Sequence, residues 1–317
     1  MTPTVLILTG EDDTQARHVA RTLGERGAVA TLVDPYRLAG MARLSVTVRP
    51  AGSHRRRLAA AGVEIDLDTL ASVWFRRPGP PLPVNGPVHA AEAIGAADGL
   101  GTIGALGAAS VAGSVGAIGD LWDSLGCLTV PAAPVVTQRA RRKLLQLLVA
   151  ERIGMEVPAT LITTDPDECL DFYQEHRGQI VTMVLDRPWT VPGGAEPPAP
   201  PIRAPDGPFL AQAHHSRKLS LRVIVVGERV FAAEIHMLGN NRGLRPHDLP
   251  DATAETCRLL IRRLGLCYGT IDLALTDEDR YIFLEVNPTG GYLLIEEATG
   301  LPITPAVCDL LLTTAPG

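Results

Sequence analysis

The first third of the chain combines two hydrophobic periods, and together they predict an α/β unit. Residues 5–8 form a short apolar run that is typical of a buried strand. Residues 13–26 carry their apolar side chains at helical spacing, and Gly27 follows them as a C-cap. Residues 30–33 then predict a second strand. A strand, a helix and a second strand in this order are typical of an α/β unit.

The pattern is less regular in the middle of the chain. Short strands are expected at residues 45–48 and 73–75, with the basic stretch 54–57 in a hairpin loop between them. Two proline-rich tracts, at residues 78–87 and 188–208, cannot form regular helix or sheet and predict loops. The second tract has eight prolines among 21 residues, which favours a flap or a linker.

The remaining elements are clearest in the C-terminal third, where apolar runs of strand length alternate with helical patterns. Two hairpins and two helices are expected in this third, and two pairs of a helix and a strand are expected before it. In chain order these are a helix at 138–153, a strand at 160–162, a helix from Pro166, a strand at 179–185, a hairpin of 221–226 and 230–236, a helix at 252–264, a hairpin of 268–275 and 281–286, and a closing helix at 302–312.

Composition and charge exclude several classes of protein. The chain has 317 residues, of which 46% are hydrophobic, so it can bury a large core. Its net charge of -6 argues against non-specific binding to nucleic acid or to an anionic membrane. Of the 29 basic residues only two, Lys143 and Lys218, are lysines, so any chemistry that needs a lysine has two candidates.

Cysteine usage and the N-terminus point to the cytoplasm. The five cysteines are scattered, without the paired spacing of a zinc or disulfide framework. The first strand meets acidic residues directly and has no basic segment before it, unlike a signal peptide. Residues 99–119 carry no charge, but seven of these 21 residues are glycine, which favours a loosely specified helix with a loop over a membrane span.

One hairpin groups three oxygen-bearing side chains. Asp272 lies on its first strand, and Glu285 and Asn287 lie two residues apart on its second strand, so those two project from one face. Pairing of the strands brings Asp272 opposite them. Carboxylate and amide oxygens suit Mg²⁺ that also binds nucleotide phosphates. The alternative is an ordinary polar face with a turn-forming Asn before Pro288.

The sequence that surrounds this hairpin resembles the C-terminal motif of ATP-grasp ligases, closest to the microviridin or graspetide maturases that crosslink ribosomal peptides. The matching stretch is FLEVNPTGGYLLIEEATGLPITPAVCDLL, at residues 283–311. Three upstream segments resemble the same enzymes in the same order: SVWFRRPGPP (72–81), KLLQLLVAERIGMEVPATLIT (143–163) and LRVIVVGERVFAAEI (221–235). The resemblance covers most of the chain.

The resemblance implies an ATP-grasp fold with an N-terminal pre-ATP-grasp α/β domain. It implies three domains: residues 1–125, a central lid at 126–208, and a C-terminal ATP-grasp domain at 209–317. It further implies ATP and Mg²⁺ as cofactors, a precursor peptide as partner, and a homo-oligomer. The implied site residues are Asp272, Glu285 and Asn287 for Mg²⁺, Lys143, Gln212 and Arg222 for ATP with Arg222 also catalytic, and Arg76 and Arg77 for the substrate.

By this resemblance the enzyme phosphorylates an Asp or Glu side chain of the peptide, and a Ser or Thr hydroxyl or a Lys amine then attacks the acyl phosphate to form an ester or amide. Two simpler roles stay open for the cations. Arg222 could pair with Glu234 across its own hairpin, and Lys143 could be a surface cation.

The sequence also departs from the family pattern on the nucleotide side. Met183 stands where these enzymes place a second nucleotide lysine, and Ala213 stands where an acidic residue usually meets the ribose. The D-W-R segment expected after Ile235 is absent, and Arg242 or Arg245 are its candidate replacements. A proline-rich tract replaces the glycine-rich phosphate loop. Two alternatives therefore remain: a non-catalytic homologue that binds peptides, or an ATP-grasp ligase of a small molecule.

Overall fold

The computed structural model describes residues 2–35, 43–49, 54–60, 62–77, 120–184, 209–214, 217–238 and 241–313. The proline-rich tracts, the uncharged segment at 99–119 and the side chain of Arg242 lie outside the described part of the chain. Within that part, no helix combines the length and the apolar character that crossing a membrane requires.

The N-terminal sheet has the strand order β2-β1-β6-β7, with all neighbours parallel. Its main helix, α1 (Thr14–Glu25), begins where Asp13 accepts a hydrogen bond from the Ala16 N–H and ends before Gly27, whose φ is +78°. The sequence-based expectations for this unit are therefore confirmed. The strands are β1 (Thr4–Leu8), β2 (Val29–Val33), β6 (Ser72–Phe75) and β7 (Leu128–Val130).

The basic stretch at 54–57 is part of a strand, and its prediction as a hairpin loop is wrong. It begins β4 (His54–Ala60), the middle strand of an antiparallel sheet with β3 (Arg43–Val48) and β5 (Val63–Asp66). A short turn of helix, Leu67–Thr69, follows. Arg56 pairs with Asp68 of this short helix, and Arg57 pairs with Glu64 of the neighbouring strand β5, so two of the three consecutive arginines of β4 have acidic partners.

The largest sheet is antiparallel and has the order β13-β12-β11-β14-β15. Alternate residues of β11 face two different cores: Val223 and Val225 pack with α8, whereas Ile224 and Val226 pack toward the N-terminal sheet. The elements are β11 (Leu219–Val226), β12 (Arg229–Leu238), β13 (Asn241–Pro246), α8 (Asp251–Arg263), β14 (Tyr268–Leu275) and β15 (Tyr281–Asn287).

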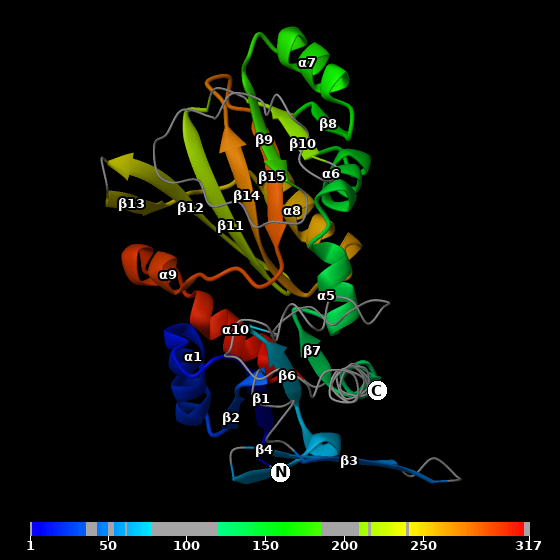
Figure 1. Cartoon of the computed structure of the whole chain (residues 1–317). Coiled ribbons are helices and arrows are strands. Elements are labelled where there is room, and N and C mark those ends of the chain that lie inside the picture. The colour runs from blue at the N-terminus through cyan, green and yellow to red at the C-terminus, as the bar shows by residue number, and fades with distance from the viewer. Residues whose placement is uncertain are drawn as a thin grey trace, which may run out of the picture.

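A smaller antiparallel sheet of order β8-β10-β9 lies beyond the large sheet and carries α7 (Pro166–Glu175) on one face (Figure 1). Its strands are β8 (Thr160–Thr163), β9 (Ile180–Val184) and β10 (Phe209–Ala213). By residue number β10 falls in the expected C-terminal domain, yet it is the central strand of the small sheet. Similarly, β7 falls in the expected lid but pairs with the N-terminal sheet.

The single helix expected at 138–153 is two helices, α5 (Pro134–Ala140) and α6 (Lys143–Arg152). Arg142 leaves the helical region with a ψ of 114°, and the side chain of Gln146 donates to the Ala140 carbonyl at 2.7 Å. This hydrogen bond satisfies a carbonyl that the end of α5 leaves open. The break places Lys143 in the first turn of a new helix.

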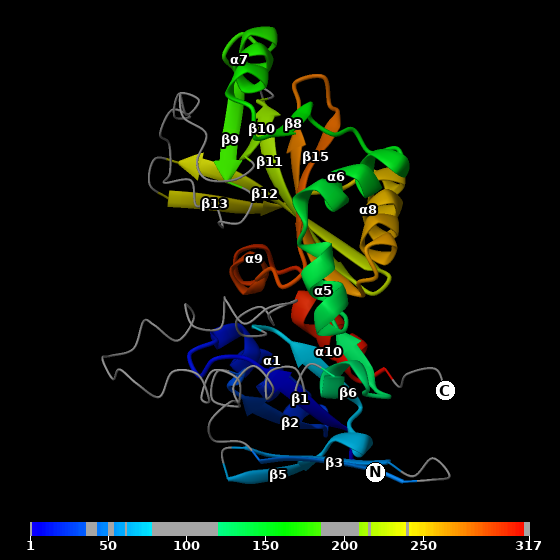
Figure 2. The same cartoon turned by 45° about the vertical axis from the view of Figure 1, so that its right-hand side comes forward.

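The closing helices join the two ends of the molecule. In both views, α9 (Leu293–Thr299) and α10 (Ile303–Leu311) lie between the N-terminal sheet and the large sheet (Figures 1 and 2). One hydrophobic core includes residues of β1, α1, β11 and α10. The N-terminal unit and the large sheet are therefore held together by a shared apolar core.

Candidate functional site

The hairpin of β14 and β15 gathers the three oxygen-bearing side chains as the sequence predicted. Asp272 lies directly opposite Glu285, and Thr270 lies opposite Asn287, so all three oxygen-bearing side chains share one face of the sheet. A bulge next to Asp272 leaves Leu284 out of the regular pairing. Glu285 and Asn287 are exposed, which leaves their oxygens accessible to a ligand.

Arg222 lies on the neighbouring strand, β11, in register with Asp272. Its Nε and Nη2 donate to the two carboxylate oxygens at 2.7 and 2.8 Å, a bidentate ion pair. This hydrogen bonding raises the pKa of Arg222 above its ordinary value. Arg222 does not pair with Glu234, the simpler role that the sequence left open.

Glu234 has other partners, which explains that outcome. It lies opposite Leu221, while Arg222 lies opposite Ala233, so the arginine and the glutamate project from opposite faces. Glu234 contacts His236 at 2.7 Å and His247 at 3.1 Å, and both imidazoles lower its pKa, His247 more strongly. Arg245 is exposed on β13, opposite Glu234 in the strand register.

Lys143 reaches the same hairpin from the first turn of α6. Its Nζ donates to the carbonyl of Leu284, the residue that the bulge leaves out of the pairing. Gln146, one turn later, bonds both the N–H and the carbonyl of Val286, at 2.9 and 2.8 Å. These hydrogen bonds fix α6 against β15. Lys143 is half-buried beside the two carboxylates and is not a free surface cation.

The charges at this face influence one another. Burial lowers the pKa of Lys143, and the carboxylates of Glu285 and Asp272 oppose that shift. Partial desolvation raises the pKa of Glu285, and the adjacent Asp272 raises it further. Two carboxylates that face each other at partly desolvated positions repel, and a cation between them relieves the repulsion.

The donor set fits a divalent cation of the magnesium type. Asp272 and Glu285 supply hard anionic oxygens, and the Asn287 amide oxygen lies on the same face. No group of three or more His, Cys, Asp and Glu side chains is arranged as a metal site in the described residues, so the amide is needed to complete this set. The Asn287 oxygen also accepts the Thr289 N–H at 3.0 Å, which orients it.

The structure places Gln212 in the small sheet, apart from the hairpin elements. Gln212 is buried, and its amide nitrogen donates to the Thr160 hydroxyl at 3.0 Å. Met183 lies in the neighbouring strand, opposite Leu210, and Ala213 ends the central strand. The small sheet therefore contains two of the positions at which the sequence departs from the family pattern, Met183 and Ala213.

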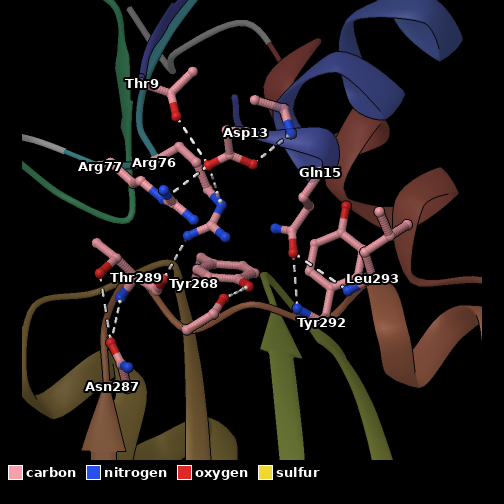
Figure 3. A network of polar contacts seen from close by, with 12 residues as sticks. Thr9, Asp13, Gln15, Arg76, Arg77, Tyr268, Asn287, Thr289, Tyr292 and Leu293 are labelled. Atoms are coloured by element: carbon pink, nitrogen blue, oxygen red, sulfur yellow. Dashed lines mark hydrogen bonds and ion pairs between the residues drawn. The ribbon is translucent and has the colours of Figure 1, made fainter. Parts of the chain in front are cut away.

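Arg76 and Arg77 lie at the end of β6 and share one carboxylate, that of Asp13 (Figure 3). The Arg76 Nε lies 3.5 Å and the Arg77 Nε 3.2 Å from the same oxygen of Asp13. Thr9 donates to that oxygen at 2.9 Å. Arg76 is buried, but the side chain of Arg77 is 60% exposed, so the two neighbours differ in their access to a ligand.

Four residues that contribute contacts to this region were not predicted from the sequence: Asp13, Gln15, Arg141 and Thr289. Thr289 lies within the matched C-terminal motif, and Asp13 could be recognised only as the start of a helix. Gln15 and Arg141 carry no local signal for this role. Their contacts join segments more than 100 residues apart.

Comparison with known proteins gives a clear result for structure. No family model matches the chain, and no curated protein matches its sequence. The macrocyclase MdnB from Microcystis aeruginosa superposes with a TM-score of 0.78 at 26% identity, covering 98% of this chain and 99% of that chain. The chain has an ATP-grasp fold.

Two further ATP-grasp structures support this assignment. The macrocyclase MdnC from Microcystis aeruginosa, bound to its precursor peptide MdnA, has a TM-score of 0.79 at 24% identity, covering 99% of this chain and 100% of that chain. A RiPP-associated ATP-grasp ligase from Chryseobacterium gregarium, in complex with ADP and a leader and core peptide, has a TM-score of 0.78 at 22% identity. It covers 100% of this chain and 98% of that chain. The expected ATP-grasp fold is confirmed.

Proposed function

We propose that this protein is an ATP-dependent ligase that activates an Asp or Glu carboxylate of a ribosomally made precursor peptide and forms an ester or amide crosslink. The observation that carries the proposal is the grouping of Asp272, Glu285, Asn287, Arg222 and Lys143 around one hairpin of an ATP-grasp fold. The similar structures support it, since they are peptide macrocyclases and ligases, one of them in complex with ADP and peptide.

In this proposal Asp272, Glu285 and Asn287 hold Mg²⁺, which neutralises charge on the phosphates of ATP when bound. Arg222 and Lys143 stabilise the negative charge that develops on the oxygens of the transferring phosphoryl group. Arg222 has a planar guanidinium that Asp272 holds at two points, so it is already oriented before phosphate binds.

The reaction balances in two transfers. A carboxylate oxygen of the peptide attacks the γ-phosphorus of ATP, the bond to the β-phosphate oxygen breaks, and ADP leaves. A hydroxyl or amine of the peptide then attacks the carbonyl carbon of the acyl phosphate. Inorganic phosphate leaves with the bonding electron pair, and the attacking group loses its proton. The net result is one crosslink and one ATP hydrolysed to ADP and phosphate.

Arg77 is the better placed of the two arginines to contact the peptide. Its guanidinium is largely exposed, and it shares the single negative charge of Asp13 with Arg76. Two cations on one carboxylate leave a positive surplus, which favours an acidic peptide segment. We expect Gln212 to contribute to the nucleotide site from the small sheet, where its buried amide is anchored by Thr160.

Calorimetry with a non-hydrolysable ATP analogue tests the nucleotide half of the proposal. Wild-type protein should bind the analogue more tightly with Mg²⁺ than without it. Asp272→Ala and Glu285→Ala should abolish this Mg²⁺-dependent gain, whereas Arg21→Met, at an exposed position of α1, should retain it. Equal affinity with and without Mg²⁺ in the wild type would contradict the assigned metal ligands.

Mass spectrometry tests the chemical half. The gene neighbourhood is searched for a short open reading frame rich in Thr, Ser, Glu and Asp. The protein is incubated with the encoded peptide, ATP and Mg²⁺, and each crosslink should remove one water from the mass of the peptide. Added hydroxylamine should instead trap the acyl phosphate as a hydroxamate. If the peptide binds but neither product forms while ATP stays intact, the protein is a non-catalytic peptide-binding homologue, the alternative that Met183 and Ala213 favour.

A homo-oligomer is also expected for this protein, and light scattering of the purified chain measures it directly. A monomeric mass at working concentration would contradict that expectation. The net charge of -6 argues against non-specific binding to nucleic acid.

A further inference from the structure

The turn that follows Asn287 is held by residues of the N-terminal unit. The Nη1 of Arg76 donates to the Thr289 carbonyl at 2.9 Å, across 213 residues of sequence. Gln15, in the first turn of α1, accepts the N–H groups of Tyr292 and Leu293 at 2.8 and 3.3 Å. Figure 3 shows these contacts meeting the turn from the side opposite to β14 and β15.

The large sheet and α5 hold the same turn from other directions. The Tyr268 hydroxyl donates to the Gly290 carbonyl at 2.5 Å. Arg141, which caps the end of α5, donates to the Thr289 hydroxyl at 2.7 Å. Thr289 and the start of α9 therefore have partners more than 100 residues away in sequence, and Gly290 has a partner on β14.

This turn sets the orientation of the Asn287 amide. The Thr289 N–H donates to the Asn287 Oδ1 at 3.0 Å, and the Thr289 hydroxyl lies 3.5 Å from the same oxygen. The direction in which Asn287 presents its oxygen therefore depends on where Thr289 is held. Arg76 fixes the Thr289 carbonyl, and Arg141 fixes the Thr289 side chain.

The side chain of Arg76 contacts the turn and is shielded from solvent. It is buried, it shares the Asp13 carboxylate with Arg77, and its Nε, 3.5 Å from that carboxylate, makes no hydrogen bond among the described residues. A buried guanidinium with an unused donor costs free energy, so the remaining contacts of Arg76 must compensate for it. Arg77 makes the same ion pair from an exposed position and has no hydrogen bond to the turn among the described contacts.

We propose that Arg76 is a positioning residue that acts through Thr289 to aim the Asn287 amide oxygen at the divalent cation. The proposal rests on the assignment of Asn287 as a metal ligand made above. It divides the two adjacent arginines by role: Arg76 orients the metal site from the N-terminal unit, and Arg77 faces the peptide. Positioning contacts behind a metal ligand commonly contribute about 10- to 100-fold to metal affinity.

Mn²⁺ binding in the presence of ADP tests this proposal without any turnover. Free Mn²⁺ is measured by electron paramagnetic resonance in titrations of the full-length protein. Arg76→Met should weaken Mn²⁺ binding about 10-fold. Arg76→Lys, which keeps the charge and one donor to the Thr289 carbonyl, should recover part of the loss. Arg77→Met removes the same charge from Asp13 but no hydrogen bond to the turn, and its Mn²⁺ affinity should change less than about two-fold.

Two further variants keep the outcome decisive. If Arg76→Met does not fold, Arg141→Met removes the other side-chain contact to Thr289 and should weaken Mn²⁺ binding in the same direction. Arg21→Met serves as a surface control, because its side chain is 67% exposed. Unchanged Mn²⁺ affinity in folded Arg76→Met, or an equal loss in Arg77→Met, would overturn the proposal. Absence of Mn²⁺ binding in the wild type would instead overturn the metal site itself.

Discussion

At the scale of single residues, the face around Asp272 places two carboxylates against two cations. Arg222 is committed to Asp272 by two hydrogen bonds, whereas Glu285 has no such bidentate partner among the described contacts. Its pKa is raised by partial desolvation and by Asp272. A raised carboxyl pKa means that ionisation of Glu285 opposes folding when no cation is bound.

The variant Glu285→Gln should therefore be more stable than the wild type at pH 7 to 8 in the absence of metal. In the wild type, the stability contributed by protonated Glu285 is fully present below the pKa that this carboxyl has in the unfolded chain, near 4.5. That stability is lost as the pH rises through the raised pKa of Glu285 in the folded protein. The gain should be below about 1 kcal/mol because Glu285 is exposed. Urea denaturation from pH 4 to 8 measures it, and a gain that grows toward acid pH would contradict this account.

At the scale of elements, the turn between β15 and α9 depends on a glycine. A Cβ on Gly290 would lie 2.0 Å from the Thr270 hydroxyl oxygen and 2.8 Å from the Thr270 Cβ. Thr270 is buried on β14, opposite Asn287, and rotation of its side chain would not remove the contact with its Cβ. The close approach of this turn to the sheet therefore requires a residue without a side chain.

The variant Gly290→Ala should lower the free energy of unfolding by about 1–3 kcal/mol through overpacking. Gly24→Ala is the matched control, because its Cβ would meet nothing within 4 Å and it lies inside α1. That control should gain up to about 1 kcal/mol from helix propensity. Urea denaturation of both variants measures the difference, and a Gly290→Ala protein as stable as the wild type would refute the close approach.

At the scale of the whole molecule, one core joins the N-terminal sheet to the large sheet. Leu311 of α10 is fully buried in it, together with Val5 of β1 and Ile224 of β11. The Leu311 carbonyl also accepts a hydrogen bond from the Ser72 hydroxyl of β6 at 2.6 Å. Because the apolar surfaces of the two units are buried against each other, we expect them to unfold together.

Leu311→Ala should destabilise the protein by about 2–5 kcal/mol, the usual cost of a cavity at a buried leucine. Leu294→Ala, at a side chain of α9 that is 75% exposed, should change stability by less than about 0.5 kcal/mol. Far-UV circular dichroism and tryptophan fluorescence should report one shared transition in the wild type. Separate transitions would show that the core does not couple the two units.

Ligand binding should also act on the whole molecule. If Mg²⁺ and ADP bind only the folded chain, a concentration of 100 times the dissociation constant adds about 2.7 kcal/mol to its stability. Thermal unfolding with and without Mg²⁺–ADP measures this gain. Asp272→Asn should lose most of it, since that change removes an anionic oxygen of the proposed metal site, and an undiminished gain would place the nucleotide elsewhere.

The sequence determined most of the strands, the helix borders near Gly27, and the pairing of Asp272 with Glu285, because periodicity and strand register are local properties. It misjudged the stretch at 54–57, a strand whose arginines pair with the acidic residues Glu64 and Asp68, and it missed the helix break at Arg142. Only the tertiary structure decided that Arg222 pairs with Asp272, and that Arg76 holds Thr289 while Arg77 stays exposed. Those contacts join residues 50 and 213 positions apart, and no local pattern encodes either of them. The pairing of β11 with β14 brings Arg222 to Asp272, and the packing of the N-terminal unit against the large sheet brings Arg76 to Thr289.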